Sequence, residues 1–177
     1  MIKKQAIKTI RTVALFLLAA TAGCGEAPKE KPDVTNTAAP AKVDISKLQL
    51  TDLDNNVVEM EQYKGKTVFV NFWATWCKPC IAEMPSIQKL QNRFKDDTIV
   101  FLLATDDDAT EIKDFKNAHD YTFNYARLES LASMNIQAIP TTFIYAADGS
   151  LAFSETGSRN WADSASIQMI LKIINQK

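Results

Sequence analysis

A seven-residue run, Thr67–Trp73, constrains the fold of this chain more than any other feature of its sequence. The run is made of β-branched and aromatic side chains with one asparagine, and it carries no charge. Successive side chains of a strand point to opposite faces of a sheet, so a strand without polar alternation must be buried on both faces. Such strands lie at the centre of largely parallel sheets. The run therefore predicts an α/β domain built on a central sheet.

The sequence after residue 44 supplies the other elements of such a domain. The further expected strands are the hairpin arms Leu48–Thr51 and Val57–Met60 around Asp54-Asn55-Asn56, then Thr98–Ala104, Thr141–Tyr145 and, after the turn Asp148-Gly149, Ser150–Phe153. The first expected helix begins at Pro79, with Ile87, Leu90 and Phe94 on one face and a kink at Pro85. Two further helices are expected, over Thr110–Ala118 and in the region of Ile167–Ile174. This order of elements predicts a three-layer α/β domain.

Residues 1–23 have the organisation of an export signal. Four basic residues and no acid occur in this segment, and the apolar run Val13–Ala20 follows the bases. That run has the length of a signal-peptide core, roughly 7–15 residues, and is well short of the ~20 residues that a membrane span requires. The sequence thus predicts an exported, extracytoplasmic protein.

The end of this signal can be interpreted in two ways, which differ in the fate of Cys24. The small residues before Gly23-Cys24 are similar to a lipoprotein processing box, although Thr21 stands where that box usually has leucine. Ala20-Thr21-Ala22 also fits ordinary A-x-A cleavage, which would leave Cys24 as an unpaired thiol in an oxidising compartment. We favour lipidation of Cys24, which would anchor the chain to a membrane.

Residues 24–43 are predicted to be a flexible tether between this anchor and the folded domain. The segment contains three of the six prolines, several charges and almost no large apolar side chains. Such a composition cannot bury enough apolar surface to offset the entropy of ordering. We therefore expect one folded domain over residues 44–177.

Charge and ligand counts exclude several function classes. A net charge of −1 gives no sign of a nucleic-acid partner. Three cysteines and one histidine, His119, are too few for the four paired ligands of a structural zinc site, so no metal is expected. We expect His119 to be solvated, and the run Asp106-Asp107-Asp108 to serve as a solvated loop or helix cap rather than a metal site.

The chemistry is expected at Trp76-Cys77-Lys78-Pro79-Cys80, at the junction between a strand and a helix. Cys77 would face the unpaired N–H groups and the positive end of the helix dipole, which favour the thiolate and lower the pKa of Cys77. Lys78 acts in the same direction, and Pro79 starts the helix. Cys80 lies one turn further in and can close a ring with Cys77. We therefore predict that Cys77 attacks a disulfide and Cys80 resolves the product.

Other uses of this cysteine pair fit less well. A structural disulfide across so short a loop removes little chain entropy. Haem attachment requires a histidine after the second cysteine, and residue 81 is isoleucine. The sequence favours a redox-active dithiol with no cofactor beyond the Cys77–Cys80 disulfide itself.

The residues from Lys64 to Cys80, with Glu83-Met84-Pro85 beyond, resemble the TlpA/ResA-like extracytoplasmic thiol–disulfide oxidoreductases of the thioredoxin superfamily, relatives of the redoxins. The resemblance covers nearly all of residues 45–177 and implies a thioredoxin fold with a central mixed sheet, an N-terminal β-hairpin and a helix–strand insertion. Ala138-Ile139-Pro140-Thr141 matches the family's second signature, which implies a cis Pro140 packed against the cysteines and an Ile139 backbone free to pair with substrate.

The resemblance also assigns expectations to two polar residues. Asn71 stands where thioredoxin has a buried aspartate that shuttles protons, and asparagine cannot titrate. Relatives of this type carry a functional glutamate at Glu83, where a partly buried carboxylate could exchange a proton with Cys80. The alternative is that Glu83 only complements the helix dipole. Trp76 is expected to offer an apolar docking surface beside the disulfide.

Three functions compete at this point. The first is a monomeric, membrane-tethered thiol–disulfide oxidoreductase acting on protein disulfides. Resemblance implies a transmembrane dithiol carrier as its electron donor and apocytochrome c, in cytochrome c maturation, as one candidate substrate. The second is a thiol peroxidase of the peroxiredoxin type, although Asn71–Trp76 lacks the proline expected ahead of a peroxidatic cysteine. The third is a non-enzymatic binding module that uses the thioredoxin surface.

Overall fold

A computed structural model describes residues 44–94 and 98–176 of the chain. The predicted signal segment 1–23, Cys24 and the tether up to residue 43 lie outside these residues, so the predicted domain boundaries stay predictions. None of the helices in the described part has the length and apolar composition needed to cross a membrane.

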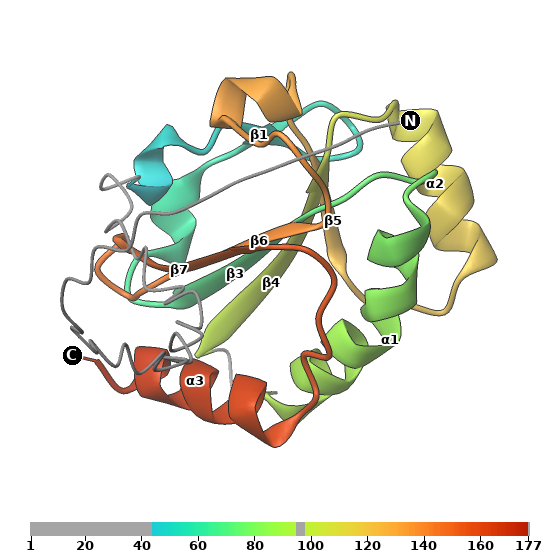
Figure 1. Cartoon of the computed structure of the whole chain (residues 1–177). Coiled ribbons are helices and arrows are strands. Elements are labelled where there is room, and N and C mark those ends of the chain that lie inside the picture. Colours follow the sequence, from blue (N-terminus) through green and yellow to red (C-terminus); the bar gives the residue numbers. More distant parts are fainter. Residues whose placement is uncertain (1–43, 95–97, 177) are drawn as a thin grey trace, which may run out of the picture. The chain divides into compact units, whose positions relative to one another are not determined.

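A mixed seven-stranded sheet forms the centre of the domain (Figure 1). The strands are β1 (Leu50–Thr51), β2 (Val57–Val58), β3 (Thr67–Phe72), β4 (Ile99–Thr105), β5 (Asn124–Arg127), β6 (Thr141–Tyr145) and β7 (Leu151–Thr156). Their order across the sheet is β2-β1-β5-β4-β3-β6-β7. The pairs β3–β4 and β4–β5 are parallel, whereas β3–β6, β6–β7, β1–β5 and β1–β2 are antiparallel. All residues of β3 are buried, which confirms that Thr67–Phe72 forms a central strand.

The three α-helices pack on one face of this sheet. They are α1 (Lys78–Arg93), α2 (Ala109–Ala118) and α3 (Ser164–Ile174). One hydrophobic cluster joins them to alternate residues of the strands, among them Phe69, Phe101 and Ile144. Figure 1 shows α3 and α1 below the sheet, with α2 on the right.

The opposite face is covered by short 3₁₀ helices and loops. These helices are η1 (Ile45–Lys47), η2 (Met60–Tyr63) and η3 (Leu131–Met134). Val68, Val70 and Phe72 point into this second cluster, because they alternate along β3 with the residues that face the α-helices. The domain therefore has three layers, the third of which is built from 3₁₀ turns.

The turns have the backbone conformations that their residues favour. The β1–β2 hairpin is shorter than predicted, but its register pairs Leu50 with Val58, and Asn55 has a φ of 67°. Asparagine tolerates this left-handed region better than most residues. Gly149, in the turn between β6 and β7, has a φ of 85°. The predicted Asp54–Asn56 and Asp148–Gly149 turns are confirmed.

Candidate active site

Cys77 and Cys80 form a disulfide at the N-terminus of α1, with their Cα atoms 5.3 Å apart. Cys77 is the N-cap residue, and the amide N–H of Cys80 donates to Cys77 Sγ at 3.3 Å. Pro79 lies in the first turn, where its missing N–H would have no helical partner. The start of α1 therefore directs backbone donors at the sulfur of Cys77, which stabilises negative charge there.

Burial distinguishes the two sulfurs and their neighbours. Cys80 is fully buried and Cys77 is 4% exposed. Lys78 and Pro79 are exposed, and Trp76 is 72% exposed directly before Cys77. Both cysteines are therefore buried, Cys77 with a small exposed area and Cys80 with none, and the exposed Trp76 lies directly before Cys77.

The loop that contains Pro140 lies next to the end of β3. The Ile139–Pro140 peptide bond is cis, as the resemblance implies. Phe72 is paired with Thr141 in the sheet, so Pro140 lies beside the segment that leads from β3 to Cys77. Ile139 is half-buried, and Pro140 is buried. The structure thus brings together the two sequence segments, 60 residues apart, in which the site was predicted.

Glu83 is buried, one turn after Cys80, and three groups donate to its carboxylate. Asn71 Nδ2 donates to Oε1 at 2.8 Å, while the backbone N–H of Arg159 (2.9 Å) and the indole N–H of Trp161 (3.3 Å) donate to Oε2. In the described part of the chain, no hydrogen bond joins Glu83 to either cysteine. Glu83 thus does more than complement the dipole of α1, because it ties the helix to β3 and to the loop before α3.

Burial dominates the electrostatics of this carboxyl. Desolvation raises the pKa of Glu83, and the negative charge of Glu155 on β7 adds to that rise. The hydrogen bonds from Arg159, Asn71 and Trp161 favour the charged form and oppose the rise without cancelling it. The outcome is a carboxyl that accepts a proton at higher pH than an ordinary glutamate.

Arg159, Trp161 and Thr142 belong to this polar centre, and the sequence analysis did not identify them. The guanidinium of Arg159 forms an ion pair with Glu155 and lies 5.3 Å from the centre of the Trp161 ring. Thr142 Oγ1 accepts from Asn71 Nδ2 at 3.0 Å. Arg159 and Trp161 lie more than 70 residues from Glu83, and no spacing pattern connects such distant positions.

The three aspartates after β4 form hydrogen bonds that hold loops and cap α2. Asp107 Oδ2 accepts from the Thr75 N–H at 2.6 Å, and Asp106 Oδ2 accepts from the Leu131 N–H at 3.1 Å. The N–H of Asp108 donates to Glu111 in a capping box of α2. The loop and cap interpretation of this run is confirmed.

His119 is less exposed to solvent than expected, because it is only partly accessible. Its ring stacks on Phe115 with centroids 4.0 Å apart and faces Tyr121 on the other side. Nδ1 is 2.8 Å from the Phe115 carbonyl oxygen, to which it donates. His119 is half-buried because the aromatic side chains of this region enclose it.

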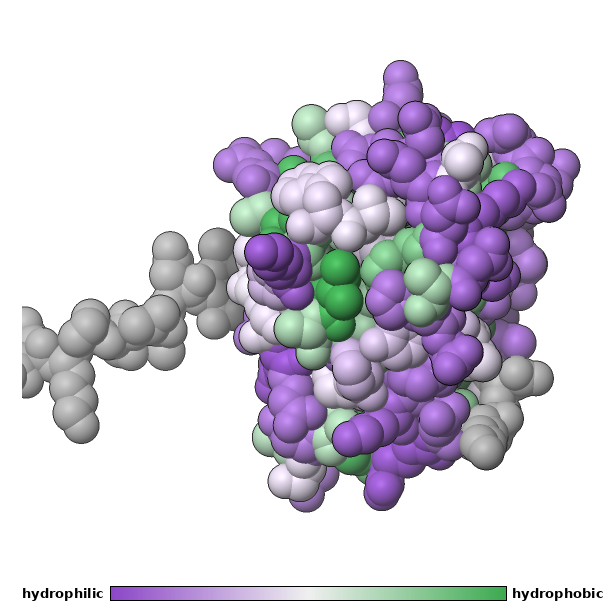
Figure 2. Space-filling view, turned by 90° about the vertical axis from the view of Figure 1, so that its right-hand side faces the viewer, coloured by the Kyte–Doolittle hydropathy of each residue, from purple (hydrophilic) through white to green (hydrophobic). Residues whose placement is uncertain are grey.

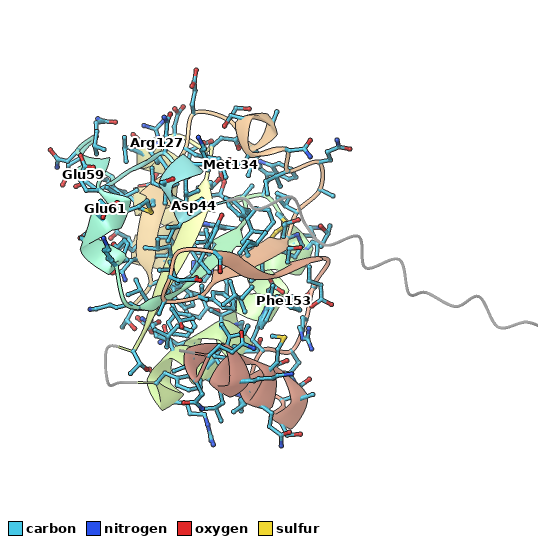
Figure 3. All side chains as sticks on the ribbon, turned by 90° about the vertical axis from the view of Figure 1, so that its left-hand side faces the viewer. Asp44, Glu59, Glu61, Arg127, Met134 and Phe153 are labelled. Atoms are coloured by element: carbon cyan, nitrogen blue, oxygen red, sulfur yellow. A yellow bond between two sulfur atoms is a disulfide. The ribbon has the colours of Figure 1, made fainter. Side chains whose placement is uncertain are left out.

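A cavity of about 560 Å³ lies beside the β1–β2 hairpin, with Glu59, Glu61 and Arg127 on its wall (Figure 3). Seen from the side on which α2 lies in Figure 1, the surface is largely hydrophilic with a small apolar area near its centre (Figure 2).

Comparison with known proteins agrees with this geometry. The Redoxin family profile matches residues 27–171. The chain belongs to the Redoxin family. Thiol-disulfide oxidoreductase ResA of Bacillus cereus is 37% identical over 105 residues, which are 56% of this Redoxin chain and 60% of the relative. The ResA of Geobacillus thermodenitrificans is 30% identical over 169 residues, 91% of this chain and 94% of the relative.

A solved structure supports the fold of this Redoxin. The exposed lipoprotein thioredoxin Etrx1 of Streptococcus pneumoniae superimposes with a TM-score of 0.56 at 22% identity, covering 77% of this chain and all of that one. The fold is therefore the thioredoxin fold, as the sequence predicts.

Proposed function

We propose that this Redoxin is a thiol–disulfide oxidoreductase that exchanges electrons with protein disulfides through Cys77 and Cys80. The observation that carries the proposal is the Cys77–Cys80 disulfide at the N-terminus of α1, in which Cys77 keeps a small exposed area next to the exposed Trp76 and Cys80 has none. The ResA relatives, whose names state this activity, support it.

In the reducing direction, the reaction starts from the Cys77 thiolate and the Cys80 thiol. The thiolate attacks one sulfur of the substrate disulfide, a Cys77–substrate disulfide forms, and the other substrate sulfur leaves with the electron pair of the broken S–S bond. Cys80 then gives up its proton and attacks Cys77 Sγ, which releases the second substrate thiolate and forms the Cys77–Cys80 disulfide. Two electrons pass to the substrate, whose two thiolates take up protons.

We assign to Glu83 the role of accepting the proton of Cys80. It follows Cys80 by one helical turn, and burial raises its pKa, so that it can hold a proton that an ordinary glutamate would release. Because no hydrogen bond joins the carboxylate to either sulfur among the described residues, we propose that the transfer runs through a water molecule or follows a small movement of the side chain.

The substrate is proposed to dock across Trp76, Ile139 and Pro140. Trp76 provides an exposed ring beside Cys77, and Ile139 provides backbone groups next to the cis bond, where an extended segment can add as a strand. Lys78 and Pro79 form the remaining exposed edge of this surface.

The proposal extends to location and partners. We place the domain outside the cytoplasm, anchored through a lipid on Cys24, with a transmembrane dithiol protein as electron donor and apocytochrome c as a candidate substrate. The signal-like residues 1–23 and the likeness to an exposed lipoprotein thioredoxin support the anchor. The mass of the exported chain decides between lipidation of Cys24 and cleavage after Ala22.

The test is to trap the reaction with the Cys80→Ala variant. Without Cys80 the Cys77–substrate disulfide cannot be resolved, so the variant is expected to accumulate a covalent complex. Dithiothreitol should cleave this complex, and mass spectrometry should locate the linkage at Cys77. Cys77→Ser/Cys80→Ala is the matched control and should trap nothing. The proposal fails if the single variant also traps nothing, or if peroxide rather than a disulfide is the oxidant that the parent turns over.

A further inference from the structure

The side chain of Asn71 connects three elements of the site. Asn71 lies in the central strand β3 and is fully buried. Its Nδ2 donates to Glu83 Oε1 on α1 at 2.8 Å and to Thr142 Oγ1 on β6 at 3.0 Å. Glu83 and Thr142 are each 3% exposed, so these hydrogen bonds are shielded from water.

One atom of this amide is left without a partner. Among the described residues, Asn71 Oδ1 is one of four buried side-chain polar atoms with no hydrogen bond. A primary amide has two N–H donors on nitrogen and two acceptor positions on oxygen. Asn71 therefore uses its whole donor capacity and none of its acceptor capacity, which is an unfavourable arrangement for a buried amide.

An ionised Glu83 would account for this arrangement of the amide. A carboxylate can only accept hydrogen bonds, so the amide must turn its nitrogen toward Glu83. The same orientation places the second N–H on Thr142, whose hydroxyl oxygen then acts as acceptor. Oδ1 is unpaired because the charge of Glu83 fixes the orientation of the amide.

Protonation of Glu83 reverses the donor and acceptor roles. A carboxylic acid has an O–H to donate, and the terminal torsion of asparagine is roughly two-fold, so a half-turn brings Oδ1 into the place of Nδ2. Oδ1 can then accept from Glu83 and from the Thr142 hydroxyl together. The number of hydrogen bonds is the same in both orientations, and the proton on Glu83 selects between them.

Thr142 is close to the surface at which substrate is proposed to bind. It is paired with Asn71 in the sheet and follows cis-Pro140 by two residues. A reversal of its hydroxyl therefore alters hydrogen bonding in the strand that continues from the Ile139–Pro140 loop.

We propose that Asn71 is a positioning residue for disulfide exchange, which holds the Glu83 carboxylate through its amide and transmits a change in the protonation of that carboxyl to the Thr142 hydroxyl. This inference rests on the proposed function of Glu83 as the proton acceptor of Cys80. It gives the neutral Asn71 a task that requires both a donor and an acceptor at one position, which neither an ionised aspartate nor leucine supplies.

The charged groups around Glu83 leave this coupling intact. On β7 and the loop after it, Glu155 forms an ion pair with Arg159, and the charge of Glu155 contributes to the raised pKa of Glu83 in both orientations of the amide. Strands β3 and β6 contribute Asn71 and Thr142, which do not titrate, and α1 contributes the disulfide, which does not titrate while oxidised. The raised pKa of Glu83 is consistent with a proton that is gained and lost above the range of ordinary glutamates.

The test follows one group in each of three side chains of the oxidised full-length protein by NMR as the pH changes. The probes are the Glu83 side-chain carboxyl carbon, the Asn71 side-chain amide and the Thr142 methyl group. We expect all three to titrate with one midpoint. The side-chain amide of Asn124, which donates to the Phe101 carbonyl, is the internal control and should not share this midpoint.

Variants separate transmission from simple proximity. In Glu83→Gln no proton is gained, so the Asn71 and Thr142 signals should lose the transition. In Asn71→Leu, which has similar volume, Glu83 should still titrate, at higher pH because it has lost a donor, and the Thr142 methyl group should no longer follow it. The pH profile for resolution of the Cys77-linked disulfide should shift to higher pH together with the titration of Glu83. The rate near the midpoint should therefore change several-fold.

The inference is overturned if the Asn71 amide does not respond where Glu83 titrates, or if Thr142 follows Glu83 equally well in Asn71→Leu. Should Asn71→Leu not fold, the Glu83→Gln spectra alone still decide, since persistence of the transition there contradicts the proposal. The NMR readout uses the oxidised protein and no substrate. A failure of Cys80→Ala to trap a partner would thus remove the exchange function without affecting the measured coupling.

Discussion

At the scale of single residues, the site places one carboxyl under two opposing influences. Burial raises the pKa of Glu83, whereas donors from Asn71, Arg159 and Trp161 lower it, and burial has the larger effect. A carboxyl in this position therefore holds its proton at higher pH than a surface glutamate does. The same imbalance makes the ionised form of Glu83 costly for the folded state.

This imbalance predicts how Glu83→Gln changes the pH dependence of stability. The folded parent binds the Glu83 proton more tightly than the unfolded chain, so its stabilising effect is complete below the ordinary glutamate pKa. This stabilisation is lost as the pH rises from the ordinary glutamate pKa to the raised pKa of Glu83. Glutamine has no such proton. Urea unfolding should show the free-energy difference, parent minus variant, falling over this pH window and constant above it.

The exposed Glu61→Gln is the control for this measurement, and its difference from the parent should not show the same fall. Asp44, Asp52 and Asp163, whose pKa values are lowered by local hydrogen bonds, contribute equally to parent and variant and cancel in the difference. A flat difference curve for Glu83→Gln would show that burial does not control this carboxyl.

Sequence reasoning located the residues whose role is local and missed those whose role depends on the tertiary fold. The spacing of Cys77 and Cys80, together with Pro79, predicts a helix start without any knowledge of distant parts of the chain. Arg159 contributes a backbone N–H to Glu83, which any residue type could supply, so its identity carried no signal. Trp161 would be buried in most folds, and only the structure shows that its indole N–H reaches Glu83.

At the scale of elements, the loop after β4 stabilises the segment before α1. The carboxylate of Asp107 accepts from the Thr75 N–H, and its backbone carbonyl accepts from Arg127 Nε on β5. The neighbouring Asp106 makes one comparable bond to the N-terminus of η3. Two adjacent aspartates thus support different elements, and only Asp107 supports the segment that carries Cys77.

The Asp107→Ala variant should therefore loosen the segment before Cys77. Loss of a charged acceptor from the Thr75 N–H is expected to lower the free energy of unfolding by about 1–3 kcal/mol. Hydrogen exchange of the Thr75 amide should become faster. Asp106→Ala is the matched control, because it removes a similar bond at an exposed position and should leave Thr75 exchange unchanged. Equal protection of Thr75 in both variants would contradict this role for Asp107.

Elements were predictable to the extent that they were long or periodic. β3, β4, β6 and the three helices follow from uncharged runs and from 3.6-residue spacing. β5 (Asn124–Arg127) was not located, because four residues with polar ends have no distinctive pattern and pair only through the neighbouring β4 and β1. The predicted hairpin arms were longer than β1 and β2, since the strands end where pairing with a partner ends.

At the scale of the whole domain, two hydrophobic clusters lie on opposite faces of the sheet and are covered by different parts of the chain. The α-helices cover the cluster that contains the disulfide. The other cluster depends on the N-terminal segment of the described chain, including Leu48 and the partly buried Ile45. The start of the folded domain should therefore coincide with the first residues that pack on this second face.

This packing predicts where truncation begins to destabilise the domain. The Ile45 N–H donates to the Gly149 carbonyl at 2.9 Å, and Asp44 caps η1 by accepting from the Ser46 N–H at 2.8 Å. A chain that begins at Asp44 keeps these contacts and should unfold at the same denaturant concentration as a chain that also retains residues 25–43. A chain that begins at Leu48 loses the burial of Ile45 and two hydrogen bonds, from the Ile45 N–H to the Gly149 carbonyl and from the Leu48 N–H to the Ile45 carbonyl, together about 2 kcal/mol. Loss of stability already at the Asp44 start would show that the domain extends further toward the N-terminus than its sequence indicates.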